Sequence, residues 1–215
     1  VDDANAGTVR NVAVAAGGKA VLSGTIVNND QDGAIDFSAT PLVELSQDVA
    51  MQNTGTGDID LATGNGTMVA GNATLTLDAD TGVVALDDAD VTTVVFSDAE
   101  GIDLYGDVRT QQSVTLGQTV LVQDNASVES TAGGVTFGSD VSAAAADTDL
   151  SVAAVQGLVD FQSTVGAGVA PLDDLTVTAR NSRFGDTVAV DANPENHRVG
   201  NTTTSTDAVP AAQIH

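Results

Sequence analysis

Aspartate is the residue type in this chain that could bind a metal ion or carry acid–base chemistry. The chain has 30 acidic and 6 basic residues, and its formal net charge is −24. Many of the aspartates stand close together in short polar stretches, and flexible carboxylate ligands of this kind suit Ca²⁺. The sequence therefore predicts calcium as the candidate cofactor, with its candidate ligands at Asp78, Asp80, Asp87, Asp88 and Asp90.

The same carboxylates have two other interpretations, which the sequence leaves open. Aspartate is a common turn residue because its side chain hydrogen-bonds the nearby main chain, so the stretches are also typical of solvated turns. A strongly acidic surface would equally fit adaptation to saline water. None of the stretches matches an EF-hand loop or a glycine-rich nonapeptide calcium repeat.

Catalytic chemistry has little support in the sequence. His197 and His215 stand in a polar C-terminal stretch without a spaced second ligand or a serine nucleophile motif. Pairs of carboxylates could serve a glycosidase or a polysaccharide lyase. Such enzymes usually hold sugars with aromatic and basic side chains, however, and this chain has one Tyr, five Phe and no Trp. We therefore expect a protein that is not an enzyme and has no catalytic residues.

The charge and hydropathy patterns also limit the partners that we expect. Phosphate backbones would be repelled by the net charge of −24, and no basic cluster gathers the few arginines, so we expect no nucleic acid. No apolar run approaches the length of a membrane-spanning helix, so we expect no membrane insertion. Self-association into a homopolymer is the partner prediction that remains, with a carbohydrate or a host surface as the alternative if the chain is an adhesin.

The elements that position the aspartates are predicted by a repeated pattern in the second half of the chain. Residues 135–141, 159–165 and 183–188 each contain a phenylalanine followed four residues later by a valine, and successive phenylalanines are about 24 residues apart. Between them, residues 149–152 and 174–177 alternate apolar and polar positions as half-buried strands do. Two strand signals in each repeat, with no helix signal between them, predict one coil of a β-solenoid.

Triplets of the same kind extend the repeat towards the N-terminus. They begin at Ile35, Ile59, Val84 and Ile102, and the interval is about 24 residues except for about 18 before Ile102 and about 33 after it. These two irregular intervals predict a shortened turn and an insertion. The central residues of the first two triplets, Asp36 and Asp60, should stack on adjacent coils with their carboxylates towards solvent, about 4.8 Å apart.

The apolar composition predicts a narrow core. Val, Ala, Leu and Ile dominate, while aromatic residues make up 3% of the chain. Small and β-branched side chains suit an interior in which each residue stacks on its counterpart one strand away. We therefore expect one continuous interior column formed by Phe37, Leu61, Leu104, Phe137, Phe161 and Phe184.

The repeats at residues 133–141, 174–179 and 184–188 resemble the degenerate repeats of large bacterial surface and adhesin proteins of the filamentous-haemagglutinin-like kind. The resemblance covers residues 100–190 well and residues 30–100 loosely. It implies a right-handed parallel β-solenoid, or β-helix. With the repeat count, the expected fold class is all-β, with about seven coils of roughly 24 residues.

The expected organisation has three parts: an N-terminal cap or connector strand at 1–30, solenoid repeats at 31–191, and a polar tail or connector at 192–215. Cysteine is absent, and the chain starts at Val1 without a signal peptide, so we expect a mature or excised piece of a secreted or cell-surface protein. The functional hypothesis is a structural building unit of an extracellular filament or surface layer, assembled head to tail. The alternative is a stalk or binding segment of a large adhesin.

Overall fold

The structure, a computed structural model, describes residues 12–62, 68–166, 168–185, 188 and 199–201. Every regular element in these ranges is a β-strand, and the named strands pair in parallel. Strands recur as stacked coils of about 23 residues, about seven in all, so the chain is a β-solenoid and the predicted fold class is confirmed. The chain divides into two compact units, Val1–Gly106 and Asp107–His215, which are described separately below.

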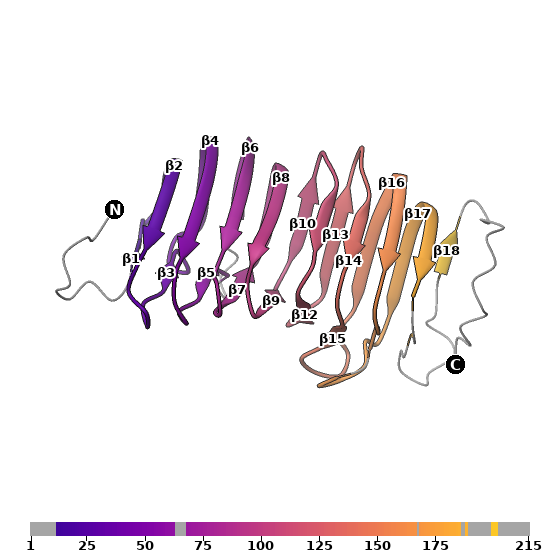
Figure 1. Ribbon diagram of the computed structural model, residues 1–215. Coiled ribbons are helices and arrows are strands. Elements are labelled where there is room, and N and C mark those ends of the chain that lie inside the picture. Colours follow the sequence, from indigo (N-terminus) through magenta and orange to yellow (C-terminus); the bar gives the residue numbers. More distant parts are fainter. Residues whose placement is uncertain (1–11, 63–67, 167, 186–187, 189–198, 202–215) are drawn as a thin grey trace. The chain divides into compact units, whose positions relative to one another are not determined.

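The first unit alternates short and long strands. Its short strands pair in the order β1, β3, β5, β7 and β9, and its long strands in the order β2, β4, β6 and β8 (Figure 1). The short strands are β1 (Val12–Ala13), β3 (Ile35–Asp36), β5 (Ile59–Leu61), β7 (Val83–Leu86) and β9 (Gly101–Leu104). The long strands are β2 (Lys19–Asn28), β4 (Leu42–Asn53), β6 (Met68–Asp78) and β8 (Asp88–Asp98).

Each long strand has two halves that join at an irregularity. The register between β2 and β4 shifts between Leu22 and Gly24, and that between β6 and β8 shifts between Gly71 and Thr74. Gly24 has a φ of 79°, which a residue with a Cβ rarely adopts. One coil therefore consists of a short strand and the two halves of a long strand.

The second unit repeats this plan with more of its strands divided. Its strands are β10 (Asp107–Thr110), β11 (Val114–Leu116), β12 (Thr119–Val122), β13 (Ala126–Ser130), β14 (Val135–Phe137), β15 (Val141–Ala143), β16 (Leu150–Phe161), β17 (Leu175–Phe184) and β18 (Val199–Asn201). β13 and β14 pair with the first and second halves of β16, so they correspond to the two halves of one long strand. The alanine-rich stretch after β15 forms turns and no helix.

The core is a set of stacked columns of apolar side chains inside the coils. In β4 the buried residues alternate with exposed or half-buried ones through Val43 and Leu45, and again through Val49 and Met51 after the irregularity. Register partners stack, so Met51 lies beside Leu77, and Leu77 beside Phe96. Alternation along the strand and stacking between strands together explain how small side chains build a dry interior.

The predicted single aromatic column is wrong, because the residues assigned to it belong to two different columns. Leu61 stacks on Leu86 and then on Leu104, all on the short strands of the first unit. Phe137, Phe161 and Phe184 also stack, but on β14 and the second halves of β16 and β17. The Ile-x-Leu and Val-x-Phe triplets share the period of a strand while occupying different sides of the coil.

The predicted insertion after Ile102 is wrong for the same reason. The residues between Ile102 and Val135 form the strands β10 to β13, of which β10 and β13 are direct register partners. That stretch therefore contains a normal short coil, in which Asp107 stacks on Ser127. The coil before Ile102 is shorter than the one before it, as predicted. Val84 is the register partner of both Ile59 and Ile102, and fewer residues separate it from Ile102 than from Ile59.

Paired strands occur in both terminal ranges that the sequence assigns to caps or connectors. β2 pairs with β4 from Lys19 to Asn28, inside the range 1–30. β18 pairs with β17 inside the range 192–215. Residues 1–11, 189–198 and 202–215, which include His197 and His215, lie outside the described residues.

Candidate functional site

The five predicted calcium ligands form two groups on different parts of the first unit. Asp78 ends β6 and Asp80 follows it, while Asp87, Asp88 and Asp90 lie at the start of β8. β6 and β8 run parallel, and Asp78 pairs with Asp98 at the far end of β8. The two groups thus lie at opposite ends of the paired strands β6 and β8.

In the group at the start of β8, the carboxylates of Asp87 and Asp88 lie close to Gly106. A Cβ on Gly106 would lie 2.5 Å from Oδ1 of Asp87 and 2.5 Å from Oδ1 of Asp88, so a larger residue would displace both carboxylates. Asp87 is buried and Asp90 is exposed. Across the described ranges, no group of three or more His, Cys, Asp or Glu residues has an arrangement that could hold a metal ion.

A row of carboxylates follows the outer face of the short strands. Asp36 stacks directly on Asp60, as the sequence predicts, and the row continues through Ala85 to Asp103. Burial raises the pKa of Asp60, the hydrogen bond from the Ala62 N–H opposes this shift, and the charges of Asp36 and Asp58 raise the pKa further. Both stacked side chains are half-buried, so they face solvent only in part.

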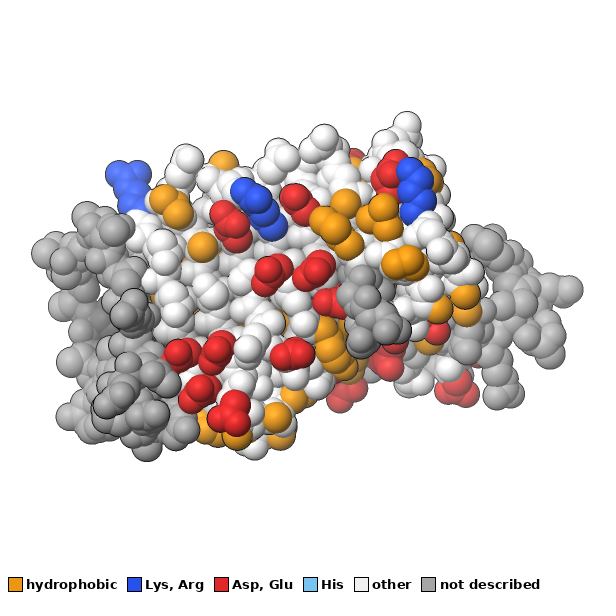
Figure 2. All heavy atoms as spheres, turned by 180° about the vertical axis from the view of Figure 1, so that it is seen from behind, with side chains coloured by type: hydrophobic (Ala, Val, Ile, Leu, Met, Phe, Trp, Pro, Cys, Tyr) orange, Lys and Arg blue, Asp and Glu red, His pale blue; other side chains and the backbone are white. Residues whose placement is uncertain are grey.

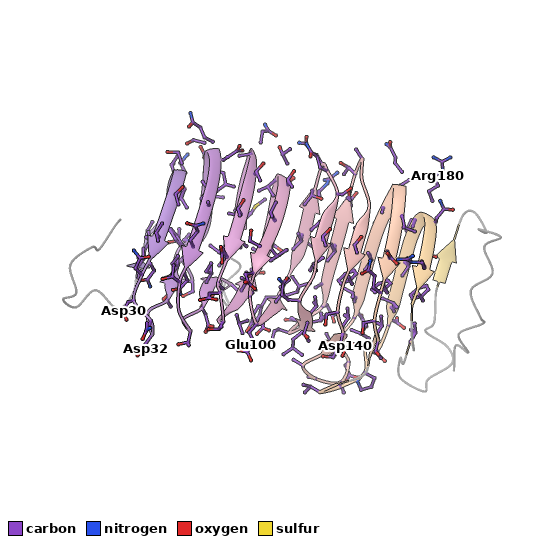
Figure 3. The ribbon with its side chains drawn as sticks, viewed as in Figure 1. Asp30, Asp32, Glu100, Asp140 and Arg180 are labelled. Carbon is purple, nitrogen blue, oxygen red and sulfur yellow. The ribbon has the colours of Figure 1, made fainter. Side chains whose placement is uncertain are left out.

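A second arrangement of carboxyl and carboxamide groups links one coil to the next. Asp58 Oδ1 accepts the main-chain N–H of Val83 at 2.8 Å, and Asp48 Oδ1 accepts that of Thr74 at 2.8 Å. Asp140, labelled in Figure 3, immediately precedes β15, and its Oδ1 accepts the N–H of Thr164 at 3.1 Å and the hydroxyl of Ser163. In each case the donor lies 23–26 residues after the acceptor, which is one coil.

Two more of these inter-coil bonds occur in succession in the second unit. Asn125 Oδ1 accepts the N–H of Asp149 at 2.9 Å, and Asp149 Oδ1 accepts the N–H of Asp174 at 3.1 Å. We call Asn125, Asp149 and Asp174 the Asx ladder, because hydrogen bonds link them in succession from coil to coil. Each of the three stands immediately before a strand, namely β13, β16 and β17. These side chains thus join adjacent coils by hydrogen bonds. The abundance of aspartate in the sequence did not indicate this structural role.

The Asx ladder borders a shallow hollow of about 320 Å³ on the second unit. Ser127, Ser151 and Thr176 are stacked register partners in its wall, and Ser127 donates its hydroxyl hydrogen to Asp107 at 2.7 Å. The lining residues are Asp107, Asn125, Ala126, Ser127, Asp149, Leu150, Ser151, Asp174 and Thr176. The hollow is therefore an acidic, hydroxyl-lined corner, and none of its lining residues is among the five predicted calcium ligands.

One buried carboxylate in the second unit is neutralised by an arginine. Arg183 donates Nε–H to Asp160 Oδ1 at 2.6 Å and Nη2–H to Asp160 Oδ2, while Gln162 also donates to Oδ2 at 3.0 Å. Burial raises the pKa of Asp160, but the hydrogen bonds from Arg183 and Gln162 outweigh it and hold the pKa below its ordinary value. The register stacks Asp160 on Thr136 and Arg183, so neither stacking partner carries a like charge.

The visible surface agrees with the acidic composition. In Figure 2, acidic side chains occur in several groups across the face, and basic side chains are few. The polar contacts of the Asx ladder and of Asp160 join coil to coil. This arrangement holds the strands in register.

Comparison with protein-family models, curated proteins and solved structures found no match to this chain. No helix that could cross a lipid bilayer occurs in the ranges that the structure describes.

Proposed function

We propose that this chain is a structural, non-catalytic building unit of an extracellular filament or surface layer, and that its copies assemble head to tail through the ends of the solenoid. The observation that supports this proposal is the incomplete burial of the first coil. Terminal strands of a sheet offer unpaired N–H and C=O groups to any strand that arrives.

The inward-facing residues of β2 are less buried than their partners in β4. Leu22 is half-buried, whereas its register partner Leu45 is 4% exposed. Ile26 is likewise half-buried, although its partner Met51 is fully buried. A further coil stacked on β2 would remove this apolar surface from water, which favours association by about 25 cal/mol for each Å².

The other end of the described solenoid has a matching feature. β18 pairs with β17 only at residues 177–179, so residues 181–184 of β17 have strand pairing on one side only within the described residues. Phe184 at this end is half-buried, while Phe161, one coil earlier, is 1% exposed. The rings of Phe161 and Phe184 are stacked at 5.2 Å, so the outer ring presents an apolar face for one more layer.

The two ends are different surfaces, so contact between them is heterologous. A heterologous contact that does not close into a ring propagates as a filament. Two copies can meet in the same way as two adjacent coils within one copy, because adjacent coils already pair through parallel strands of the same kind.

The proposal is tested by electron microscopy of the purified chain and of two charge variants. Leu22→Asp places a carboxylate where a second copy would bury it, and we expect this variant to remain monomeric. Val21→Asp is the matched control, because Val21 is 53% exposed and points away from the core. We expect Val21→Asp to form the same filaments as the wild type.

Circular dichroism of both variants checks that the monomer is folded. A wild-type chain that stays monomeric at every concentration would refute the proposal, as would filaments that Leu22→Asp leaves unchanged. Electron microscopy of the native material separates the adhesin alternative, since isolated rods on a cell surface would favour a stalk and continuous filaments with a regular axial repeat would favour a building unit.

A further inference from the structure

Asn72 begins the tripeptide Asn72-Ala73-Thr74, which has the Asn-x-Ser/Thr pattern of an N-glycosylation acceptor. The same pattern occurs at residues 65–67, 125–127 and 201–203. A chain rich in Ser and Thr contains such tripeptides by chance, and sugars attach where the asparagine lies at the surface. The place of each pattern in the fold therefore decides which of them can serve.

Asn72 lies in a β-bulge in the middle of β6. The register of β6 with β8 shifts between Gly71 and Thr74, where two residues of β6 stand opposite one residue of β8. The extra residue of a bulge leaves the ladder of strand hydrogen bonds. Of the two residues in the bulge, Ala73 is buried and Asn72 is exposed. The bulge thus places the Asn72 side chain at the surface of the coil.

Main-chain contacts hold the bulge on both sides of Asn72. Gly71 has a φ of 155°, and an added Cβ on it would lie 2.4 Å from the main-chain oxygen of Leu45, so β6 packs tightly on β4 at this point. Two residues after Asn72, the main-chain N–H of Thr74 donates to Asp48 Oδ1 at 2.8 Å. Neither contact involves the Asn72 carboxamide or the Thr74 hydroxyl, which are the two groups that define the acceptor pattern.

The pattern at residues 125–127 has a different role in the fold. Asn125 Oδ1 accepts the N–H of Asp149 at 2.9 Å, and the Ser127 hydroxyl donates to Asp107 at 2.7 Å. An enzyme that reads the pattern needs both the carboxamide and the hydroxyl two residues later. In residues 125–127 both groups join adjacent coils, and the enzyme would have to break both bonds.

We propose that Asn72 is a modification site that carries an N-linked oligosaccharide. The co-substrate is an activated sugar, a glycosyl diphosphate. A bond forms between Asn72 Nδ2 and the sugar C1, the bond from C1 to the diphosphate oxygen breaks, and Nδ2 gives up one proton to a base of the transferase. This inference rests on the extracellular location in the proposed function. β6 pairs with β4 on one side and β8 on the other, so the sugar stands away from the first coil.

Peptide mass spectrometry of the full chain, isolated from the cells that make it, tests the site. We expect the peptide that contains Asn72 to carry the mass of an added oligosaccharide, and Asn72→Gln to lose it. Thr74→Ala should lose the same mass, because it keeps Asn72 and removes only the hydroxyl of the acceptor pattern. Thr74→Ser is the matched control, since it keeps a hydroxyl, and we expect it to retain the sugar. Circular dichroism checks that each variant is folded.

An unmodified Asn72 in the wild type would overturn the inference, whether or not Asn125 carries a sugar. A sugar that remains on Asn72 in Thr74→Ala would also overturn it, because the attachment would then not follow the acceptor pattern. Electron microscopy scores assembly separately. Filaments of a chain without sugar on Asn72 would leave the proposed function standing, and a glycosylated chain that stays monomeric would refute head-to-tail assembly while supporting Asn72 as a modification site.

Discussion

Asp36 and Asp60 are direct register partners on β3 and β5, and both carboxylates are half-buried on the outer face of these strands. Two unit charges at the spacing of adjacent strands repel by about 1 kcal/mol even at the dielectric constant of water. The next position of the row is Ala85, and the carboxylate row resumes only at Asp103. The alanine limits the direct stacking of like charges in this row to one pair.

Asp60→Asn should stabilise the protein at neutral pH. The substitution removes the repulsion from Asp36 while keeping an oxygen that can accept the N–H of Ala62, now bonded to Asp60 Oδ1 at 2.9 Å. We expect the free energy of unfolding to rise by about 0.5–1 kcal/mol in urea titrations at low ionic strength. Asp32→Asn is the control, because it removes one charge from an exposed turn.

The pH dependence of the Asp60→Asn effect follows from the raised pKa of Asp60. Because the folded state binds the proton more tightly than the unfolded state, wild-type stability increases as the pH falls through this raised pKa. The advantage of Asp60→Asn should therefore be full at neutral pH and shrink in acid. An effect equal to that of Asp32→Asn at every pH would contradict the repulsion between Asp36 and Asp60.

Arg183→Gln should lower the melting temperature at neutral pH by leaving the buried carboxylate of Asp160 without its cation. Removing one partner of a buried ion pair is more damaging than removing one partner of an exposed pair. Arg109→Gln is the matched control, because the side chain of its partner Glu129 is 39% exposed, against 6% for Asp160. We expect a clear loss for Arg183→Gln and a small one for Arg109→Gln in thermal melts.

The difference between Arg183→Gln and the wild type should disappear in acid. The folded pKa of Asp160 lies below its ordinary value, so the ion pair contributes its full stability above the unfolded pKa of Asp160 and loses it as the pH falls through the lower, folded pKa. Melts from neutral pH to below the ordinary Asp value test this. A deficit that persists unchanged at the lowest pH would mean that Arg183 stabilises the coil by packing.

The sequence predicted the coil because its strands obey simple spacing rules. Ile35 and Ile59 are buried and stack on adjacent coils, with Asp36 and Asp60 between the apolar positions and on the outer face. The period of two in each triplet identifies a strand, but it carries no information on which side of the coil that strand occupies. For this reason the sequence pattern predicts a single column where the structure has two, one containing Phe161 and the other Leu61.

The Asx ladder was beyond sequence reasoning for a different reason. Asn125 and Asp149 are ordinary turn residues by type, and their role depends on which main-chain N–H lies one coil further along. A signal was present in retrospect, since Asn125, Asp149 and Asp174 recur at the interval of one coil.

Phe161→Ala should cost about 3–5 kcal/mol of unfolding free energy, because it opens a cavity in the middle of a stacked column. The Phe161 ring lies between those of Phe137 and Phe184, at centroid distances of 4.7 Å and 5.2 Å. Phe184→Ala is the matched comparison, and its cost should be smaller because Phe184 is half-buried and lies at the outer end of this column. Urea titrations that find equal costs for the two variants would contradict this account of the column.

Ionic strength should stabilise the folded chain. The net charge of −24 is concentrated by folding, and raising salt from about 0.1 M to about 1 M shortens the screening length from about 10 Å to about 3 Å. We therefore expect the melting temperature to rise with NaCl. Calcium should add to this effect if it binds the predicted ligands, so a chelator should lower the melting temperature at constant ionic strength.

The double variant Asp87→Asn, Asp88→Asn distinguishes calcium binding from screening. These two carboxylates both approach Gly106, so a divalent ion bound there would relieve their mutual repulsion, and the variant should lose the response to calcium while keeping the response to NaCl. Asp78→Asn, Asp80→Asn makes the same test of the other predicted group. A wild-type melting temperature that ignores chelator but follows NaCl would leave screening as the sole effect. Indifference to both would show that the acidic turns are fully solvated in the folded coil and do not strain it.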